Sequence, residues 1–470
     1  MIPVTLADVA ALTGGRLHPD DAATRDVVVD GPVVTDSREA GPGGLYVARV
    51  GEHADGHDFV AAAAAAGAVA ALVTRVVSDV PCVVVDDTQD AFAAVAREVV
   101  RRADGLDVVG ITGSSGKTST KDLLGAVLGS AGPTVAPVGS YNSEVGVPLT
   151  VCRVTQDTRF LVVEMGARGT GHIEYLTTMA PPRVGIVLNV GTAHIGEFGS
   201  REAIGRAKSE LVAALPADGL AVLNADDPVV RAMAGVTRAR TVLVGEAPDA
   251  EVRADDVALD DRGRPSFTVR TPTGERRVTL ALVGRHHVAN ALSVVATALE
   301  LGLGLDDVVA ALASAVPASR WRMEVTERPD GVIVVNDAYN ANPDSMRAAL
   351  VALERIGRGR RTWAVLGTML ELGDESDTLH EQVGEEAVAR GVDELVVVGT
   401  AATRLADGAE RARAERGGAT RVRTVADADA AEALLREELR SGDVALFKSS
   451  RDAGLRLLGD RLAAPPEEQT

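Results

Sequence analysis

Short, continuous apolar runs alternate with longer amphipathic segments along almost the whole chain. Apolar strands separated by helices are typical of parallel sheets whose two faces are both covered by helices. The pattern therefore predicts an α/β protein. The runs that we interpret as strands are 33–34, 45–48, 70–73, 82–85, 108–112, 160–163, 184–188, 221–223, 241–244, 332–335, 362–366, 395–398 and 444–447.

The same pattern divides the chain into three predicted domains. Residues 1–105 form a small α/β domain, in which 87–102 is the clearest helix. Residues 106–314 form a central parallel-sheet domain, in which the polar, alternating stretch 251–282 predicts an antiparallel appendage. Residues 315–470 form a second doubly wound, Rossmann-like unit. The connections between the domains are the expected hinges.

Composition narrows the class of protein. The chain has 470 residues, and 46% of them are hydrophobic, which excludes whole-chain disorder. Lys and Arg number 48 against 67 Asp and Glu, a net charge of −19. Such an acidic chain is a poor candidate for binding nucleic acid, which needs clustered cations. At roughly 100–200 residues per domain, the length also agrees with three domains.

Compartment signals favour the cytoplasm. Cys82 and Cys152 lie in apolar stretches without a pairing pattern, as expected of buried thiols in a reducing compartment. Residues 1–15 lack the basic start of a signal peptide. The longest uncharged run, 59–73, is mostly alanine and shorter than the ~20 apolar residues of a membrane span.

A glycine- and serine-rich loop is the sharpest motif. It runs from Gly110 to Ser119, directly after a predicted strand and before a helix that begins near Lys117. Glycines let the backbone N–H groups and the helix N-terminus wrap around phosphate. Lys117 can reach the β- and γ-phosphates and Thr118 can ligate Mg²⁺. Ile111 stands where the usual phosphate loop has its first glycine.

Three oxygen or nitrogen ligands follow strands of this central domain. Thr118 lies in the phosphate loop, Glu164 ends the strand 160–163, and His194 follows the strand 184–188. The carboxyl ends of parallel strands meet at one edge of the sheet, where open α/β proteins bind ligands. A carboxylate, a hydroxyl and an imidazole beside phosphate predict a Mg²⁺ site.

Lys208 interrupts an apolar stripe on the predicted helix 201–215, because it shares one face with Ile204, Leu211 and Leu215. A buried lysine has a lowered pKa, and its neutral amine can react with CO₂ to form a carbamate. Alternatively, the side chain extends along the helix to water. Periodicity alone favours the second alternative.

Taken together, these motifs resemble the ATP-dependent Mur ligases, and the resemblance covers almost the whole chain. The segments that carry it are 36–38, 42–48, 55–59, 110–119, 142–150, 164–166, 189–194, 207–211, 223–228, 286–290, 337–346 and 366–373. The last two point to the branch that adds D-alanyl-D-alanine to UDP-MurNAc-tripeptide. The Asp-Asn-Pro-Arg motif of the diaminopimelate-adding branch is absent.

The resemblance implies a role for each matching residue. Lys117, Lys208 and His194 would be catalytic, with Lys208 carbamylated, which reverses the preference from periodicity. Thr118, Glu164, His194 and Lys208 would hold Mg²⁺, with two ions expected. ATP would contact Gly113, Ser114, Ser115, Gly116, Lys117, Thr118, Ser119, Asn290 (adenine), Asp337 (ribose) and Arg322. Substrate would contact Ser37 and Arg38 (the uridine diphosphate end), Asn142, Arg168, Asn340, Asn342 and Lys448.

Three positions depart from the family pattern. His287 replaces an asparagine of His-Asn-x-x-Asn, Thr368 an aspartate of Gly-Asp-Met-x-Glu-Leu-Gly, and Ser449 a glycine of Lys-Gly-Ser-Arg.

The implied reaction is ATP-dependent amide formation through an acyl phosphate, in the synthesis of peptidoglycan precursors. The first domain would hold the nucleotide-sugar end, the second ATP and the third the incoming dipeptide. We expect a monomer without nucleic-acid or membrane partners. The alternatives are another amino-acid-adding Mur ligase or folylpolyglutamate-type ligase, and a P-loop NTPase switch that joins no substrates.

Overall fold

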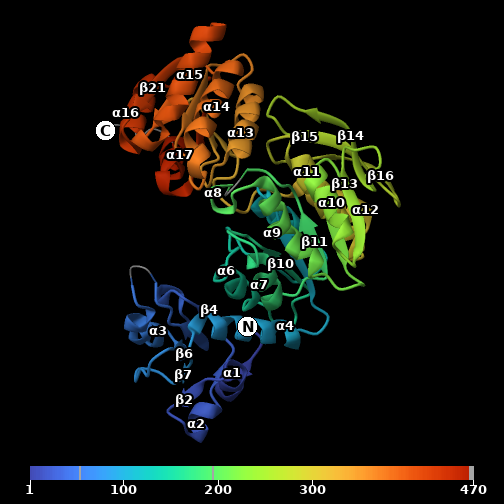
Figure 1. Ribbon diagram of the computed structural model, residues 1–470, viewed down its shortest axis with the longest axis vertical. Coiled ribbons are helices and arrows are strands. Elements are labelled where there is room, and N and C mark those ends of the chain that lie inside the picture. Colours follow the sequence, from blue (N-terminus) through green and yellow to red (C-terminus); the bar gives the residue numbers. More distant parts are fainter. Residues whose placement is uncertain (52–53, 193–194, 465–470) are drawn as a thin grey trace.

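The computed structural model describes residues 1–51, 54–192 and 195–464. The molecule is elongated, with the N-terminal part at one end of its long axis and the C-terminal part at the other (Figure 1). Within the described residues the strands form three large sheets and one two-stranded ribbon, β1–β3. The α/β class predicted from the apolar runs is confirmed.

The N-terminal unit is a five-stranded sheet in the order β2-β7-β6-β5-β4. Alternate residues of β5 face opposite cores: Leu45 and Val47 pack with α1 and α4, whereas Tyr46 packs with α3. The elements are β1 (Val4–Thr5), α1 (Leu6–Thr13), β2 (Arg16–His18), α2 (Ala22–Arg25), β3 (Val28–Val29), β4 (Val33–Val34), η1 (Ser37–Glu39), β5 (Gly44–Val47), η2 (Gly56–Phe59), α3 (Val60–Ala65), β6 (Ala68–Val73), β7 (Cys82–Val84) and α4 (Thr88–Arg102).

The central unit is a nine-stranded sheet in the order β16-β15-β14-β13-β12-β11-β8-β10-β9. Helices α5 and α11 cover one face, and α6, α7 and α9 cover the other. Its elements are β8 (Asp107–Thr112), α5 (Lys117–Gly129), β9 (Thr134–Val135), α6 (Gly146–Val151), β10 (Phe160–Glu164), α7 (His172–Met179), β11 (Val184–Val187), α8 (Ile195–Phe198), α9 (Arg201–Ala213), β12 (Leu220–Asn224), α10 (Pro228–Ala232), η3 (Met233–Gly235), β13 (Arg240–Gly245), β14 (Val252–Leu259), β15 (Pro265–Thr271), β16 (Gly274–Thr279), α11 (His287–Glu300) and α12 (Leu305–Ser314).

Strand β8 lies between β10 and β11 and is parallel to both. The chain leaves β8 toward one side of the sheet and later crosses to the other, so the order of strands reverses there. Ligands of open α/β sheets bind at such a crossing point, at the carboxyl ends of the strands. The predicted antiparallel appendage is also present, but it is continuous with this sheet, because β14 pairs in parallel with β13.

The C-terminal unit is a six-stranded sheet in the order β17-β18-β22-β19-β20-β21, parallel except for β17. Helices α13, α14 and α15 pack on one face and α16 and α17 on the other. Its elements are β17 (Glu324–Glu327), β18 (Ile333–Asn336), α13 (Pro343–Ile356), β19 (Thr362–Leu366), η4 (Gly373–Glu375), α14 (Ser376–Ala389), β20 (Glu394–Val398), η5 (Thr400–Ala402), α15 (Thr403–Arg416), β21 (Arg421–Val425), α16 (Ala428–Glu438), β22 (Val444–Lys448), η6 (Arg451–Ala453) and α17 (Leu455–Ala463).

Several contacts join the central and C-terminal units, and two of them lie at the connection before β17 and at α8. In the connection between α12 and β17, Ser319 donates its backbone N–H and its hydroxyl to the carboxylate of Asp122 on α5 (2.8 and 3.1 Å). At the other side, α8 meets η4, where Gly196 donates its backbone N–H to the carbonyl of Glu371 (3.2 Å). Both contacts lie beside the carboxyl edge of the central sheet, so they border the predicted ligand site.

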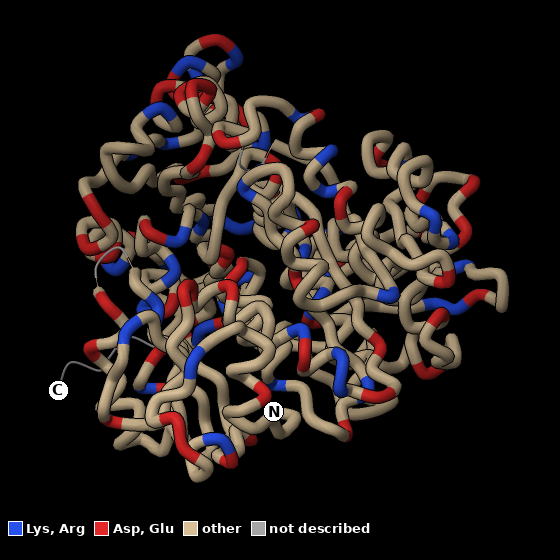
Figure 2. The backbone as a smooth tube through the Cα atoms, turned by 60° about the horizontal axis from the view of Figure 1, so that its bottom comes forward, with Lys and Arg blue, Asp and Glu red and all other residues tan. Residues whose placement is uncertain are grey.

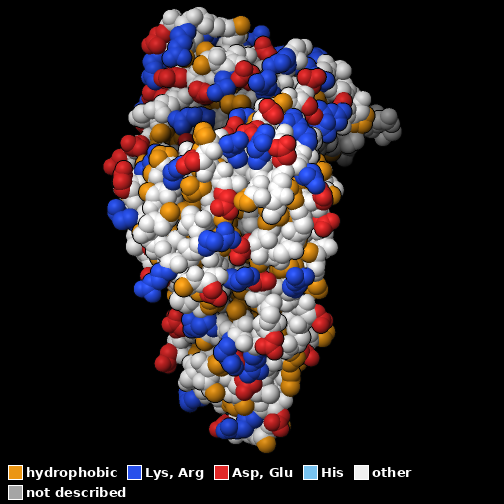
Figure 3. All heavy atoms as spheres, turned by 90° about the vertical axis from the view of Figure 1, so that its right-hand side faces the viewer, with side chains coloured by type: hydrophobic (Ala, Val, Ile, Leu, Met, Phe, Trp, Pro, Cys, Tyr) orange, Lys and Arg blue, Asp and Glu red, His pale blue; other side chains and the backbone are white. Residues whose placement is uncertain are grey.

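Charged side chains of both signs are intermixed along the backbone (Figure 2). On the face in Figure 3, hydrophobic side chains are scattered among them rather than gathered in one patch. The net negative charge is therefore not concentrated at one place on that face. In the part of the chain that the structure describes, no helix combines the length and apolar character that crossing a bilayer requires.

Candidate active site

A cavity of about 1000 Å³ lies between the central and C-terminal units. Loops after β8, β10 and β11 and the start of α11 form one wall, and loops of the C-terminal sheet form the opposite wall. Most of the residues predicted from sequence line it: Ser114, Ser115, Gly116, Lys117, Thr118, Ser119, Asn142, Arg168, Lys208, Asn290, Arg322, Asp337, Asn340, Asn342 and Lys448.

The phosphate loop follows β8 and runs directly into α5. Gly116 has φ of +83°, and a Cβ there would lie 2.9 Å from Oδ1 of Asn290. Only glycine therefore lets the loop pass this close to α11. No side chain caps the N-terminus of α5, so its N–H groups remain available for an anion. The loop fits the predicted phosphate cradle.

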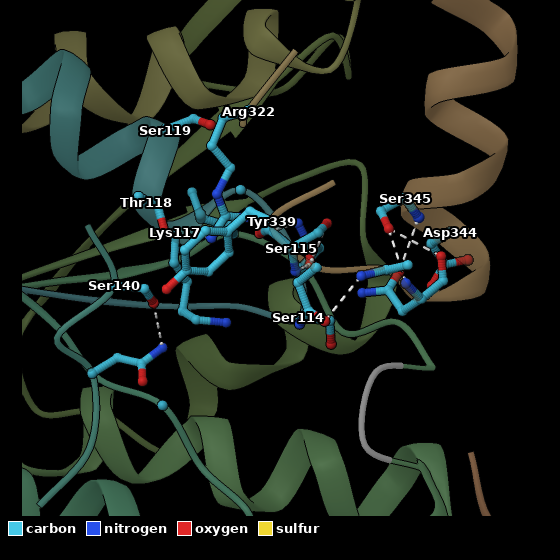
Figure 4. A pocket seen from close by; sticks show the side chains of 18 of the residues that line it. Ser114, Ser115, Lys117, Thr118, Ser119, Ser140, Arg322, Tyr339, Asp344 and Ser345 are labelled. Atoms are coloured by element: carbon cyan, nitrogen blue, oxygen red, sulfur yellow. Dashed lines mark hydrogen bonds between the residues drawn. The ribbon is translucent and has the colours of Figure 1, made fainter. Parts of the chain in front are cut away.

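Two cations converge on the start of α5. Burial lowers the pKa of Lys117 to about 8, although the charge of Glu164 opposes this shift. Arg322, from the connection before β17, donates to the hydroxyl of Thr118 (3.1 Å). Its guanidinium carbon lies 4.1 Å from the centre of the Tyr339 ring. Figure 4 shows Arg322, Lys117 and Thr118 around the same space, with the Tyr339 ring beside Arg322.

Glu164, at the end of β10, lies next to this loop. One of its carboxylate oxygens accepts hydrogen bonds from Thr118 (3.3 Å) and Ser140 (3.2 Å), whereas Oε1 has no hydrogen-bond partner. Burial raises the pKa of Glu164, against the charges of Lys121, Arg322 and Lys117, which lower it. A buried carboxylate oxygen that accepts no hydrogen bond, beside a hydroxyl, fits a Mg²⁺ ligand set.

The third predicted metal ligand, His194, lies outside the described residues. Within the described ranges, no cluster of three or more His, Cys, Asp or Glu side chains could hold a metal ion. The fit therefore rests on Glu164 and Thr118, with phosphate oxygens supplying further ligands.

Lys208 is only 4% exposed and lines the cavity from α9. Burial lowers its pKa well below the usual value, and the positive charge of Lys117 lowers it further. Its amine donates no hydrogen bond to any described residue. The preference from periodicity, a lysine extended to water, is wrong, because the helix packs this face against the sheet and not against solvent.

The start of α11 also lines the cavity. His287 and Asn290 are both buried, and Nδ2 of Asn290 lies 3.4 Å from Nδ1 of His287. Burial lowers the pKa of His286 and lowers that of His287 still more strongly, where the charge of His286 adds to the effect. The histidine that replaces the family's asparagine at position 287 is therefore neutral at physiological pH and next to the predicted adenine contact.

The C-terminal wall contains residues that are already engaged with one another. Lys448 donates to the carboxylate of Asp337 (2.6 Å) and to two backbone carbonyls. Asn342 caps α13 through a reciprocal pair of hydrogen bonds with Ser345. Asn340 accepts from the backbone N–H of Ala341 (2.9 Å). These residues shape the wall.

Four predicted residues do not line the cavity. Ser37 and Arg38 belong to η1 in the N-terminal unit, where Arg38 pairs with Asp36 at the surface. Gly113 belongs to the phosphate loop, and its carbonyl accepts a hydrogen bond from Lys117 (2.6 Å). Glu164 contacts two residues that do line the cavity, Thr118 and Ser140, which donate hydrogen bonds to its carboxylate.

Sequence reasoning missed several residues that the fold brings to the site. Lys121 is buried on α5, next to Asp122 (2.8 Å) and 3.9 Å from Glu164. Tyr339 and Arg451 line the C-terminal wall and lie close to each other. The only available signal was that Lys121 follows Lys117 by one helical turn and that Tyr339 and Arg451 adjoin recognised motifs.

The chain matches three family descriptions over most of its length. They are "Mur ligase family, catalytic domain" over residues 32–108, "Mur ligase middle domain" over 111–298 and "Mur ligase, glutamate ligase domain" over 321–451.

Known proteins agree with this match. UDP-N-acetylmuramoyl-tripeptide–D-alanyl-D-alanine ligase of Mycobacterium tuberculosis is 48% identical over 504 residues, which covers 99% of this chain and 98% of that protein. The protein of the same name from Escherichia coli is 38% identical, with 85% of this chain and 86% of that protein covered.

Two solved structures extend the similarity to the fold. MurF from Acinetobacter baumannii superposes with a TM-score of 0.87 at 31% identity, covering 98% of this chain and 99% of that one. MurF ligase from Thermotoga maritima in complex with ADP superposes with a TM-score of 0.79 at 29% identity, covering 93% and 98%.

Proposed function

The chain belongs to the Mur ligase family, and on that premise we propose that it joins D-alanyl-D-alanine to UDP-MurNAc-tripeptide at the expense of ATP. The products are UDP-MurNAc-pentapeptide, ADP and phosphate. The observation that carries the proposal is the cavity itself: a phosphate loop and two cations face a separate C-terminal wall across one space. A regulatory NTPase needs the first wall but not the second.

The chemistry requires both walls. A carboxylate and an amine do not condense in water, because hydroxide is a poor leaving group. The terminal carboxylate of the tripeptide attacks the γ-phosphorus of ATP, ADP leaves, and an acyl phosphate forms. The dipeptide amine then attacks the acyl carbon and loses a proton, while phosphate leaves. Lys117 and Arg322 offset the repulsion between carboxylate and triphosphate, which amounts to roughly 1–4 kcal/mol per charge pair at 4 Å.

We infer that Thr118, Glu164 and His194 hold magnesium, which would neutralise phosphate charge when bound. Oε1 of Glu164, which is buried and accepts no hydrogen bond, supports this assignment. We also infer that Lys208 is carbamylated. Its amine is buried, its pKa is strongly lowered, and no described residue accepts a hydrogen bond from it. A carbamate would add an anion beside Lys117.

The three units would divide the substrates among them. We assign the nucleotide-sugar end, through Ser37 and Arg38, to residues 1–105, ATP to 106–314 and the dipeptide to 315–470. Contact between the last two units would exclude the water that otherwise hydrolyses the acyl phosphate. We further infer that the protein acts as a monomer in the cytoplasm, where ATP is available and where its two buried thiols stay reduced.

Acceptor dependence tests the function. With ATP and UDP-MurNAc-tripeptide present, we expect D-alanyl-D-alanine to stimulate ADP release, and mass spectrometry to find the dipeptide in the product. Single amino acids, glutamate among them, replace the dipeptide in control reactions that test for the activity of other ligases of the family. If ADP is released at the same rate with and without each acceptor, the result contradicts the proposal and favours an NTPase switch.

A further inference from the structure

Arg451 is a cation on the C-terminal wall that the chemistry described above does not use. It begins η6, directly after β22, and its side chain lines the cavity. Its guanidinium carbon lies 5.7 Å from the centre of the Tyr339 ring. Within the described part of the chain, the guanidinium pairs with no carboxylate and donates no hydrogen bond, although its neighbour Asp452 also lines the cavity.

The other cations nearby are already committed. Lys448 is buried and bonded to the carboxylate of Asp337, so its charge is neutralised. Arg322 donates to Thr118 at the phosphate loop and therefore belongs to the ATP end of the cavity. Among the described residues of the C-terminal unit, Arg451 is thus the cavity-lining cation that remains open to an anion from outside the chain.

The spacing of the two arginines indicates what that anion belongs to. Arg322 and Arg451 contact the same ring of Tyr339, so their guanidinium carbons are at most about 10 Å apart. A dipeptide spans up to ~7 Å, and a hydrogen bond adds ~3 Å. A dipeptide is therefore long enough to reach from the phosphate end, near Arg322, to Arg451.

We propose that Arg451 binds the terminal carboxylate of the incoming dipeptide and thereby selects an acceptor with a free C-terminus. The inference rests on the proposed function, and it deepens it by assigning a subsite. Arginine matches the two oxygens of a carboxylate with parallel N–H donors. The guanidinium carbon lies over the Tyr339 ring, whose face attracts the cation and so helps to hold it in place. A phosphate group of ATP shares the same chemistry, so the test must separate the two anions.

The test compares two acceptors and three proteins. The acceptors are D-alanyl-D-alanine and D-alanyl-D-alaninamide, which lacks only the carboxylate charge. In Arg451→Gln we expect kcat/KM for the free dipeptide to fall roughly 10- to 100-fold, mainly through KM, because one charge-assisted contact is lost. In the unchanged protein, kcat/KM for the amide should be lower than kcat/KM for the free dipeptide by a similar factor. Arg451→Gln should leave kcat/KM for the amide unchanged. Arg451→Lys should recover part of the preference.

Arg320→Ala is the matched control. Arg320 also lies over an aromatic ring, that of Trp321 (5.2 Å), but it pairs with Asp460 and does not line the cavity. Arg320→Ala should leave kcat/KM for both acceptors unchanged. The proposal is overturned if Arg451→Gln and the unchanged protein show the same ratio of kcat/KM between the free dipeptide and its amide. It is also overturned if the substitution raises the KM for ATP by a matching factor, because Arg451 would then bind phosphate. If the unchanged protein adds no dipeptide at all, the proposed function fails as well.

Discussion

At the scale of single residues, Lys208 shows how burial changes chemistry. The amine would be charged in water, but on α9 it lies against the sheet and near Lys117, and both conditions favour the neutral form. A neutral amine is the form that reacts with CO₂. The same burial would disfavour loss of the carbamate once it has formed, because the side chain of Lys208 has few other groups to bond with.

We therefore expect Lys208→Ala to lower ligase activity about 100-fold, the upper range for loss of a metal-supporting group. Short carboxylic acids should restore part of it by entering the vacated space as replacement anions. The measurement is the ligase rate with and without added acetate or propionate, with the unchanged protein as control for general effects of the acids. A folded variant that no acid rescues would count against the carbamate. Labelling with ¹³C-bicarbonate gives a direct second readout.

At the scale of elements, α14 supports a loop of the cavity. His380 on this helix is buried, accepts a hydrogen bond from the backbone N–H of Met369 (2.9 Å) and donates to the carbonyl of Ser376 (2.7 Å). This arrangement requires the neutral imidazole. The loop that follows β19 contains Thr368, the family's aspartate position, and leads to Leu370 and Glu371 at the cavity.

Burial lowers the pKa of His380 below 6.5, although the carbonyl of Ser376 and the charge of Asp377 oppose the shift. Below pH 6.5 the unfolded chain therefore binds a proton that the folded protein excludes, and stability falls as the pH falls. We expect the melting temperature to decrease more steeply between pH 7 and 5 in the unchanged protein than in His380→Gln. His172→Gln, at an exposed position, is the control. Parallel pH profiles for all three proteins would refute this role.

At the scale of the whole molecule, the two large units are held against each other at the cavity. The carboxylate of Asp344, in the first turn of α13, accepts from the backbone N–H (3.1 Å) and the hydroxyl (3.3 Å) of Thr192. A Cβ at Gly191 would lie 2.3 Å from the same carboxylate oxygen. This contact joins the C-terminal unit to the loop after β11 and so fixes the width of the site.

We expect Asp344→Ala to reduce kcat/KM for the ligase reaction about 10-fold, because two hydrogen bonds to a charged acceptor are lost. The melting temperature should change little, since the contact lies between units and not within a core. Small-angle scattering should show a larger radius of gyration. Arg347→Ala is the matched control, because it removes only the partner that Asp344 has within its own unit (3.2 Å). Unchanged activity and dimensions in Asp344→Ala would exclude this contact as a determinant of closure.

The sequence alone determined the α/β class, most of the strands and the strand–loop–helix unit that we interpret as a phosphate loop. Each of these depends on residues that are close along the chain: apolar runs bury themselves as strands, and a glycine-rich turn between a strand and a helix cradles phosphate wherever that unit occurs. The position of Glu164 at the end of a predicted strand already indicated that it lies near this loop. The family pattern added the burial of Lys208, which local periodicity by itself interpreted wrongly.

The tertiary structure decided what meets across the cavity. Arg322 reaches Thr118 and Asp344 reaches Thr192 only because the central and C-terminal sheets are joined by the connection anchored at Ser319. Arg451 shares an aromatic ring with Arg322 because the fold of the C-terminal unit brings the two together. Residues that lie more than a hundred positions apart leave no periodic trace in the sequence. Their proximity follows from the packing of whole units, which no local pattern of hydrophobic and polar residues encodes.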